Sequence, residues 1–222
     1  TNVICNGMLT LHFGVTETIG SLSGAGLVQF RQGTGSHLIV GNNNSSTIFA
    51  GRITPGNGDG ALTKIGSAAL TLTGDSTYSG GTIVSGGALQ IGGGSATGSI
   101  LGDVTNNASL IFNRSDDLTF GGAISGTGSV TKLGANTLTL TGANTYAGGT
   151  TIADGKLVVD NDLNLGSAGG IVTFEGGTFR SEGVWAIFPS TRHFVANGAD
   201  AVFEIGNSGI VNGGICGSGG SW

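Results

Sequence analysis

The sequence predicts an all-β fold, a parallel β-helix of stacked coils, on the strength of three observations. Glycine supplies 46 of its 222 residues, proline only 2, and charged residues 9%, against roughly 7% glycine and about 25% charged residues in ordinary soluble domains. Short Leu, Ile, Val and Phe clusters alternate with Gly, Asn, Asp and Ser, which is typical of many short strands joined by turns. One stretch of sequence also occurs twice, which indicates a chain built from repeats.

Composition and charge exclude several classes of protein. A hydrophobic content of 38% and a mean hydropathy of +0.24 are too high for a disordered chain, which needs low hydrophobicity and high net charge. The net charge is −5 and the eight Lys and Arg residues are scattered singly, so no nucleic acid is expected as a partner. No apolar run approaches the roughly 18 residues that cross a bilayer as a helix.

The repeat defines the organisation of the chain. Residues 59–91 align with residues 127–159 at a constant offset of 68, with 16 of 33 positions identical. The similarity extends upstream, where residues 48–64 match residues 119–132 around a three-residue insertion, and a truncated third copy is predicted at about 210–222. We therefore expect a single β-helix over residues 1–222, as a fragment of a longer protein.

Apolar clusters recur at the same places in both copies. They are Leu70 with Leu72, Val84, and Leu89 with Ile91 in the first copy, and Leu138 with Leu140, Ile152, and Leu157 with Val159 in the second. Because side chains alternate across a strand, each cluster predicts a half-buried strand, with threonines on the opposite face. Such short strands must stack on equivalent strands of the next coil. Three coils to each repeat offset predict coils of roughly 22–23 residues and roughly ten coils in all.

The residues between these strands predict tight corners. Eight glycines fall there: Gly74, Gly80, Gly81 and Gly87 in the first copy, and Gly142, Gly148, Gly149 and Gly155 in the second. Glycine suits corners because it adopts backbone conformations that other residues avoid. The only two tyrosines, Tyr78 and Tyr146, occupy the same corner of the two copies. We expect them to pack across it rather than to stack on a ligand.

These residues resemble a known family. The segment KLGANTLTLTGANTYAGGTTIADGKLVV and its copy KIGSAALTLTGDSTYSGGTIVSGGALQI are similar to the autotransporter-associated β-strand repeat, found in passenger domains of type V secreted bacterial proteins. The resemblance implies a right-handed parallel β-helix, exported across the outer membrane and either extracellular or held at the bacterial cell surface. It also implies a structural, non-catalytic passenger segment that supports export and adhesion, with host or neighbouring-cell surfaces or glycans as partners.

The sequence contains few residues in patterns typical of a catalytic site. The nearest approach to a nucleophile motif, Gly74-Asp75-Ser76, has Ala143 and Asn144 at the acid and serine positions of the second copy, which indicates a variable turn rather than a serine hydrolase site. Among the three histidines, His12 alternates with apolar neighbours and is expected to face solvent. The sequence therefore predicts no catalytic, cofactor-binding or metal-binding residue.

Carboxylates leave one enzymatic alternative open, a glycan-active β-helix acting as a lyase or hydrolase. The closest acidic groups are Asp116 with Asp117, and Asp160 with Asp162. If Asp160 and Asp162 shared one strand face, they would suit Ca²⁺ or paired acid and base chemistry. The simpler interpretation is a solvated turn after Val159.

A third alternative is an extracellular fibre subunit, because an uncapped solenoid end is an open sheet edge. Cys5 and Cys216 lie near opposite ends of the chain, beyond the separation of about 7 Å that a disulfide within one straight rod permits. They are predicted instead as candidates for a disulfide between molecules that associate end to end.

Overall fold

The structure is a computed structural model, and it describes residues 1–31, 33, 35–183, 187–189, 191–197, 202–206, 210–211 and 215–217. These residues form two compact units, residues 1–111 and 112–222. Each unit is a parallel β-solenoid, so the predicted fold class is confirmed. No helix among the described residues is long and apolar enough to cross a membrane. The predicted third repeat copy at 210–222 lies mostly outside the described residues.

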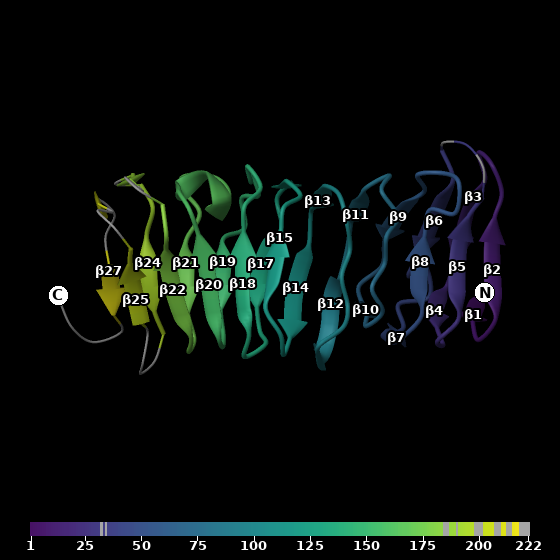
Figure 1. Ribbon diagram of the computed structural model, residues 1–222, viewed down its shortest axis with the longest axis horizontal. Helices are drawn as coiled ribbons and strands as arrows, with labels where there is room; N and C mark the ends of the chain where they lie inside the picture. The colour runs from purple at the N-terminus through teal and green to yellow at the C-terminus, as the bar shows by residue number, and fades with distance from the viewer. Residues whose placement is uncertain are drawn as a thin grey trace. The chain divides into compact units, whose positions relative to one another are not determined.

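Unit 1 consists of short strands, and the strand pairs described within it are parallel (Figure 1). Its sheets run in the orders β2-β5-β8, β3-β6-β9-β11-β13 and β7-β10-β12, with β1 beside β4. The strands are β1 (Asn2–Ile4), β2 (Met8–Leu11), β3 (Thr16–Ile19), β4 (Ser21–Ser23), β5 (Leu27–Phe30), β6 (His37–Val40), β7 (Thr47–Phe49), β8 (Arg52–Thr54), β9 (Ala61–Lys64), β10 (Ala69–Leu72), β11 (Thr82–Val84), β12 (Ala88–Ser95) and β13 (Val104–Asn106), with β14 (Ser109–Arg114) at the boundary.

Unit 2 repeats this arrangement (Figure 1). Its sheets run in the orders β15-β18-β20-β22-β25 and β17-β19-β21-β24-β27, with β23 beside β26. The elements are β15 (Leu118–Phe120), β16 (Ile124–Ser125), β17 (Ser129–Lys132), β18 (Thr137–Leu140), β19 (Thr150–Ile152), β20 (Lys156–Val159), the 3₁₀ helix η1 (Asp162–Leu165), β21 (Val172–Phe174), β22 (Thr178–Ser181), β23 (Ile187–Phe188), β24 (Phe194–Ala196), β25 (Val202–Ile205), β26 (Ile210–Val211) and β27 (Ile215–Gly217).

Strand register gives the length of each coil, because paired residues occupy the same place in successive coils. In unit 1, Met8 pairs with Leu27, and Leu27 pairs in turn with Arg52 across a longer coil. In unit 2, Leu118 pairs with Leu138. The predicted coil length of roughly 22–23 residues is longer than the spacing from Met8 to Leu27 and shorter than the spacing from Leu27 to Arg52. The strands make about nine turns, against the roughly ten that the repeat predicts.

The core lies inside the coils, where the sequence predicted it. Leu70 and Leu72 are 1% and 0% exposed, and their counterparts Leu138 and Leu140 are both fully buried. Thr71, between the two first-copy leucines, is half-buried on the outer face. The other predicted clusters are also buried, namely Val84, Leu89, Ile91, Ile152, Leu157 and Val159. Because these side chains leave water as coils stack, each coil depends on its neighbours for stability.

Corner glycines are needed for two different reasons. Gly81 and Gly149 have φ angles of 87° and 80°, a left-handed region that favours glycine. Gly74 and Gly142 have no such angle; a Cβ there would lie 2.1 Å from the Gly51 carbonyl oxygen and 2.3 Å from the Gly122 carbonyl oxygen, respectively. In these columns a glycine lets the backbone of one coil approach that of the coil before it.

Candidate binding groove

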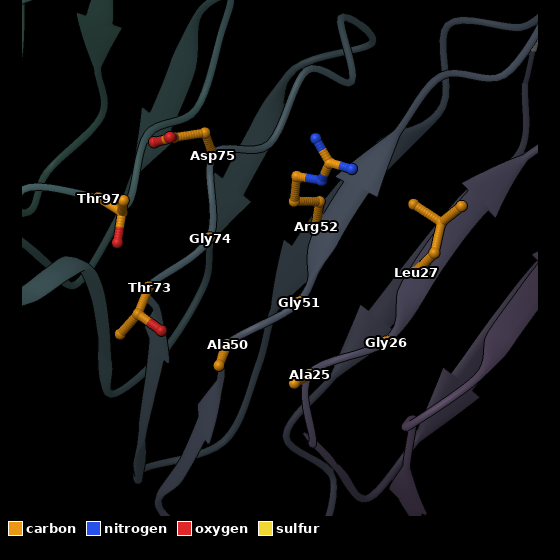
Figure 2. A pocket seen from close by; sticks show the side chains of 10 residues that line it. All are labelled: Ala25, Gly26, Leu27, Ala50, Gly51, Arg52, Thr73, Gly74, Asp75 and Thr97. Carbon is orange, nitrogen blue, oxygen red and sulfur yellow. The ribbon is translucent and has the colours of Figure 1, made fainter.

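A shallow groove crosses the outside of unit 1 where successive coils turn a corner. It is lined by Ala25, Gly26, Leu27, Ala50, Gly51, Arg52, Thr73, Gly74, Asp75 and Thr97, and its volume is about 450 Å³. Figure 2 shows that these residues come from equivalent places in neighbouring coils. We refer to these ten residues as the corner groove.

The floor of the corner groove is backbone. A Cβ on Gly51 would lie 1.8 Å from the Gly26 carbonyl oxygen, and one on Gly74 would lie 2.1 Å from the Gly51 carbonyl oxygen. Ala25 and Ala50, beside these glycines, are exposed and carry only a methyl group. The hollow therefore exists because the close stacking of coils requires glycine at this corner.

Two charged residues and two threonines border this floor. The Arg52 side chain extends from the start of β8 and lies between Leu27 and Asp75 (Figure 2). Arg52 is exposed, and no side-chain hydrogen bond or ion pair joins it to any residue that the structure describes. Thr73 and Thr97 add hydroxyl groups from the next two coils. The guanidinium is therefore free to bind an anionic group in the groove.

Asp75 is held by the coil that follows it. Its Oδ1 accepts hydrogen bonds from the Gly98 backbone N–H and the Ser99 hydroxyl, both at 3.0 Å. Its neighbour Ser76 is 1% exposed, and its Oγ accepts a hydrogen bond from the Ile53 N–H at 3.1 Å. Ser76 therefore ties two coils together, as the interpretation of Gly74-Asp75-Ser76 as a turn requires.

The second repeat copy keeps this corner but not its charges. Alignment of the copies places Ala123 at the position of Arg52 and Ala143 at that of Asp75. Asn144, which replaces Ser76, is 4% exposed, and its Oδ1 accepts a hydrogen bond from the Ile124 N–H at 2.8 Å. The inward hydrogen bond is thus preserved by a different side chain, while both charges on the solvent side disappear.

A buried arginine occupies the neighbourhood of the second corner. Arg192 is 0% exposed, and its Nε donates a hydrogen bond to Asp162 Oδ1 at 2.7 Å. Its other nitrogens donate to backbone carbonyls of η1 and of the loop that follows it, those of Asp162, Leu165, Gly166 and Gly170. η1 lies directly on the corner, because the Asn144 N–H donates to the Leu163 carbonyl at 2.7 Å.

The predicted carboxylate pairs do not form an acid and base site. Strand β20 ends at Val159 and Asp162 begins η1, so Asp160 and Asp162 do not share a strand face. Asp160 is exposed, but the Asp162 side chain is only 15% exposed because it binds Arg192. The expectation of a wholly solvated turn is therefore wrong for Asp162.

Asp116 and Asp117 also have structural contacts. Asp116 accepts two hydrogen bonds from Arg114, at 2.9 and 2.8 Å. Asp117 Oδ1 accepts the Thr137 N–H at 2.8 Å, which joins two coils. His12 is exposed, as predicted. Among the described residues, no three His, Cys, Asp or Glu side chains gather closely enough to hold a metal ion.

The tyrosines pack inside the corners, as predicted. Tyr78 and Tyr146 are 0% exposed, and their hydroxyls share hydrogen bonds with Thr82 and Thr150 at 2.7 and 2.6 Å. Burial raises the pKa of both phenols, that of Tyr146 to about 12.

Sequence reasoning missed a buried lysine in each copy. Lys64 is 2% exposed and Lys132 0% exposed. Lys64 Nζ donates to the carbonyls of Ile65, Gly66 and Gly86, and Lys132 Nζ to those of Gly134 and Asp154. Each ammonium thus binds carbonyls from two successive coils. Burial lowers the pKa of both lysines, that of Lys132 to about 8.

The predicted disulfide between molecules involves Cys5 and Cys216. Cys5 is 5% exposed, and its Sγ lies 3.6 Å from the carbonyl oxygens of Gly7 and Leu27. The side chain of Cys216 lies outside the described residues. A disulfide between molecules stays a prediction, and it requires the backbone around Cys5 to open.

Parallel coils, glycine columns and matching corners define a β-solenoid repeat protein. The family model of the passenger-associated-transport-repeat matches residues 62–91 and 130–159, within the two copies. The chain therefore carries two copies of this repeat. It is also 36% identical to the adhesin BmaC autotransporter of Brucella suis biovar 1 (strain 1330), over 54% of this chain and 4% of that adhesin's length. No solved structure matches the chain significantly.

Proposed function

We propose that this chain is a β-solenoid segment of a bacterial autotransporter passenger, exported to the cell surface and serving adhesion without catalysis. The observation that carries the proposal is the pair of passenger-associated-transport-repeats, each folded into coils with the same buried leucines, lysine and tyrosine. Similarity to an autotransporter adhesin supports the same role. The side chains of Asp116, Asp117 and Asp162 each accept a hydrogen bond from another residue of the chain, which favours this structural role over glycan cleavage.

The coil-by-coil fold suggests how such a segment assists its own export. Each coil contacts only its neighbours, so a solenoid can fold progressively as it emerges from a membrane. Buried leucines and lysine contacts form as each new coil stacks on the last. A folded outer part then resists sliding back, and this draws the remaining chain outward.

Surface delivery of the parent protein tests this mechanism. Leu138→Asp places a carboxylate at a fully buried position, where an unpaired charge costs several kcal/mol. We expect delivery, measured by antibody labelling and protease accessibility on intact cells, to fall severalfold. Thr139→Asp is the matched control, because Thr139 is the half-buried neighbour on the outer face of β18. Unaltered delivery of the Leu138→Asp protein would overturn the export role.

Two further measurements test the remaining parts of the proposal. Bacteria that display the parent protein should adhere to host cells or to one another more than bacteria with this segment deleted but the protein still displayed. The purified chain should leave neutral and acidic polysaccharides uncleaved with and without Ca²⁺. Reproducible cleavage, lost on Asp116→Asn or Asp160→Asn substitution, would replace the structural role with an enzymatic one.

A further inference from the structure

We infer that the corner groove of unit 1 binds a glycan segment that carries an isolated carboxylate beside neutral sugars, with Arg52 holding the acid group. This inference rests on the proposed adhesive function and names the ligand class of the groove. It starts from a hollow of about 450 Å³, a volume within the range of about 300–1,000 Å³ common to ligand sites.

The shape of the groove favours an extended ligand. Its lining comes from four successive coils, represented by Leu27, Arg52, Asp75 and Thr97. Because neighbouring strands lie about 4.8 Å apart, these coils span about 14 Å. The floor between Gly26 and Gly74 is free of large side chains. A short oligosaccharide can therefore lie along the stacking direction and touch every coil.

The chemistry of the groove favours a glycan over a peptide. Its polar side chains are one guanidinium, one carboxylate and two threonine hydroxyls, which suit the many hydroxyl groups of sugars. An extended peptide would need a free strand edge or apolar pockets. Strands β5 and β10, beside the groove, each pair with a strand on both sides. Strand β8 is the last strand of its sheet, but on its outer edge the Ile53 N–H donates to the Ser76 hydroxyl and the Ile53 carbonyl accepts the Thr77 N–H. Leu27 is the largest apolar side chain in the lining.

The charge pattern favours one acid group rather than a dense polyanion. Arg52 is the single cation in the groove, and Asp75 lies one coil away with its carboxylate anchored to Gly98 and Ser99. The planar guanidinium binds a carboxylate through two parallel hydrogen bonds. Asp75 and the chain's net charge of −5 repel further anions.

The two repeat copies strengthen this assignment. Both charged positions belong to the part of the corner where the copies differ, since Arg52 and Asp75 become Ala123 and Ala143. The inward hydrogen bond of the corner is kept in both copies, from the Ile53 N–H to Ser76 and from the Ile124 N–H to Asn144. The second copy folds its corner without either charge, and the Arg52 guanidinium of the first copy makes no hydrogen bond or ion pair with a described residue, so it is available for binding.

Titration of the purified chain tests the inference with three oligosaccharides. A hyaluronan hexasaccharide supplies carboxylates separated by neutral sugars, a chitin hexasaccharide is neutral, and a heparin hexasaccharide is densely sulfated. We expect binding of the hyaluronan probe, at least tenfold weaker binding of the chitin probe, and amide NMR shifts centred on Gly51 and Gly74. Equal affinity for chitin, tighter Arg52-dependent binding of heparin, or no binding of hyaluronan would each overturn it.

Variants then locate the site. Arg52→Ala should weaken hyaluronan binding about tenfold, and Arg52→Lys about threefold, because lysine keeps the charge but loses the planar fork. Arg31→Ala is the matched control: it removes the same charge from an exposed position of unit 1 outside the groove, and it should bind normally. Unchanged binding by Arg52→Ala would overturn the site.

Two controls separate the remaining explanations. A glutamate-containing glycine peptide that displaces the hyaluronan probe with equal affinity would replace the glycan with a peptide ligand. Surface delivery of the Arg52→Ala parent protein should remain normal, whereas Leu138→Asp should lower delivery severalfold. Failure of glycan binding therefore leaves the proposed export role standing, and failure of export leaves binding by the purified chain intact.

Discussion

The two repeat copies share their interior and differ at one corner of their surface. Tyr78 and Tyr146 share hydrogen bonds with equivalent threonines, and Lys64 and Lys132 bind equivalent backbone carbonyls. On the solvent side, the first copy carries a charged groove, whereas η1 covers the corresponding corner of the second. Shared residues thus build the coil, and differing residues decide what lies on its surface.

The difference between the corners has a clear physical origin. A groove remains in the first copy because its glycine floor is bordered mainly by small side chains, with Leu27, Arg52 and Asp75 as the larger ones. In the second copy, the chain after Val159 turns into η1 and contacts Asn144 through backbone and side-chain hydrogen bonds. Holding η1 there requires a partner for its carbonyls, and Arg192 supplies it.

Removal of Arg192 should break the second corner and is the largest effect that we predict. Arg192→Met leaves the Asp162 carboxylate and several carbonyls without their buried donor. Loss of one partner from a buried ion pair costs about 3–5 kcal/mol, so the free energy of unfolding of unit 2 should fall by about that amount. Urea unfolding followed by circular dichroism measures it.

The control for this substitution is an exposed arginine of the same unit. Arg180 is 42% exposed and pairs with Glu182, an interaction worth less than about 1 kcal/mol. Arg180→Met should therefore change the free energy of unfolding much less than Arg192→Met. Equal losses for the two variants would show that Arg192 does not fix the corner.

Much of the fold could be predicted from the sequence because its cause is local. Alternation of Leu and Thr shows which face of a strand is buried, and repeated glycines mark the corners. Strands such as β10 and β18 can therefore be predicted from a few neighbouring residues. The tyrosine corner was predicted correctly because the same aromatic residue recurs at a turn. These features depend on period and backbone sterics alone.

The rest could not be predicted because its partners are distant in sequence. Arg192 is far along the chain from Asp162, with no pattern linking them. The lysines were aligned between the copies, but a charged side chain is rarely buried, so their role was missed. The groove does leave a signal: Arg52 and Asp75 are one coil apart and both are lost in the second copy.

The buried lysines predict an intermediate effect that depends on pH. Burial lowers the pKa of Lys132 to about 8, although the carboxylates of Asp154 and Asp117 act in the opposite direction. An unfolded lysine keeps its proton up to about pH 10.4. Between these values the unfolded chain binds more protons, so the free energy of unfolding should rise with pH, by about 1–2 kcal/mol from pH 8 to 10.

Urea unfolding at several pH values checks this rise. It should be smaller in Lys132→Met and absent when Lys64→Met is added, because burial lowers the pKa of Lys64 as well. Above about pH 10 the sign reverses, since burial raises the pKa of Tyr146 to about 12, while an unfolded tyrosine ionises at about pH 10. An identical slope in the wild-type and doubly substituted chains would contradict the assignment.

The smallest effect concerns an inward polar position where the copies use different side chains. Ser76 accepts a single hydrogen bond, from the Ile53 N–H. Asn144 accepts the equivalent bond from Ile124 and also donates to the Asn164 carbonyl at 2.6 Å. A buried group left without its partner costs about 1–3 kcal/mol.

Ser76→Ala should therefore cost about 1 kcal/mol and Asn144→Ala about 2 kcal/mol, measured as free energies of unfolding in urea. The matched controls are Thr77→Ala and Thr145→Ala, identical exposed residues one position further along, which should each change stability by less than about 0.5 kcal/mol. A larger loss at Ser76 than at Asn144 would mean that the first corner depends on contacts other than this hydrogen bond. The expected order would instead mean that the second copy holds its corner more firmly because it must also hold η1, whereas the first copy leaves its corner open.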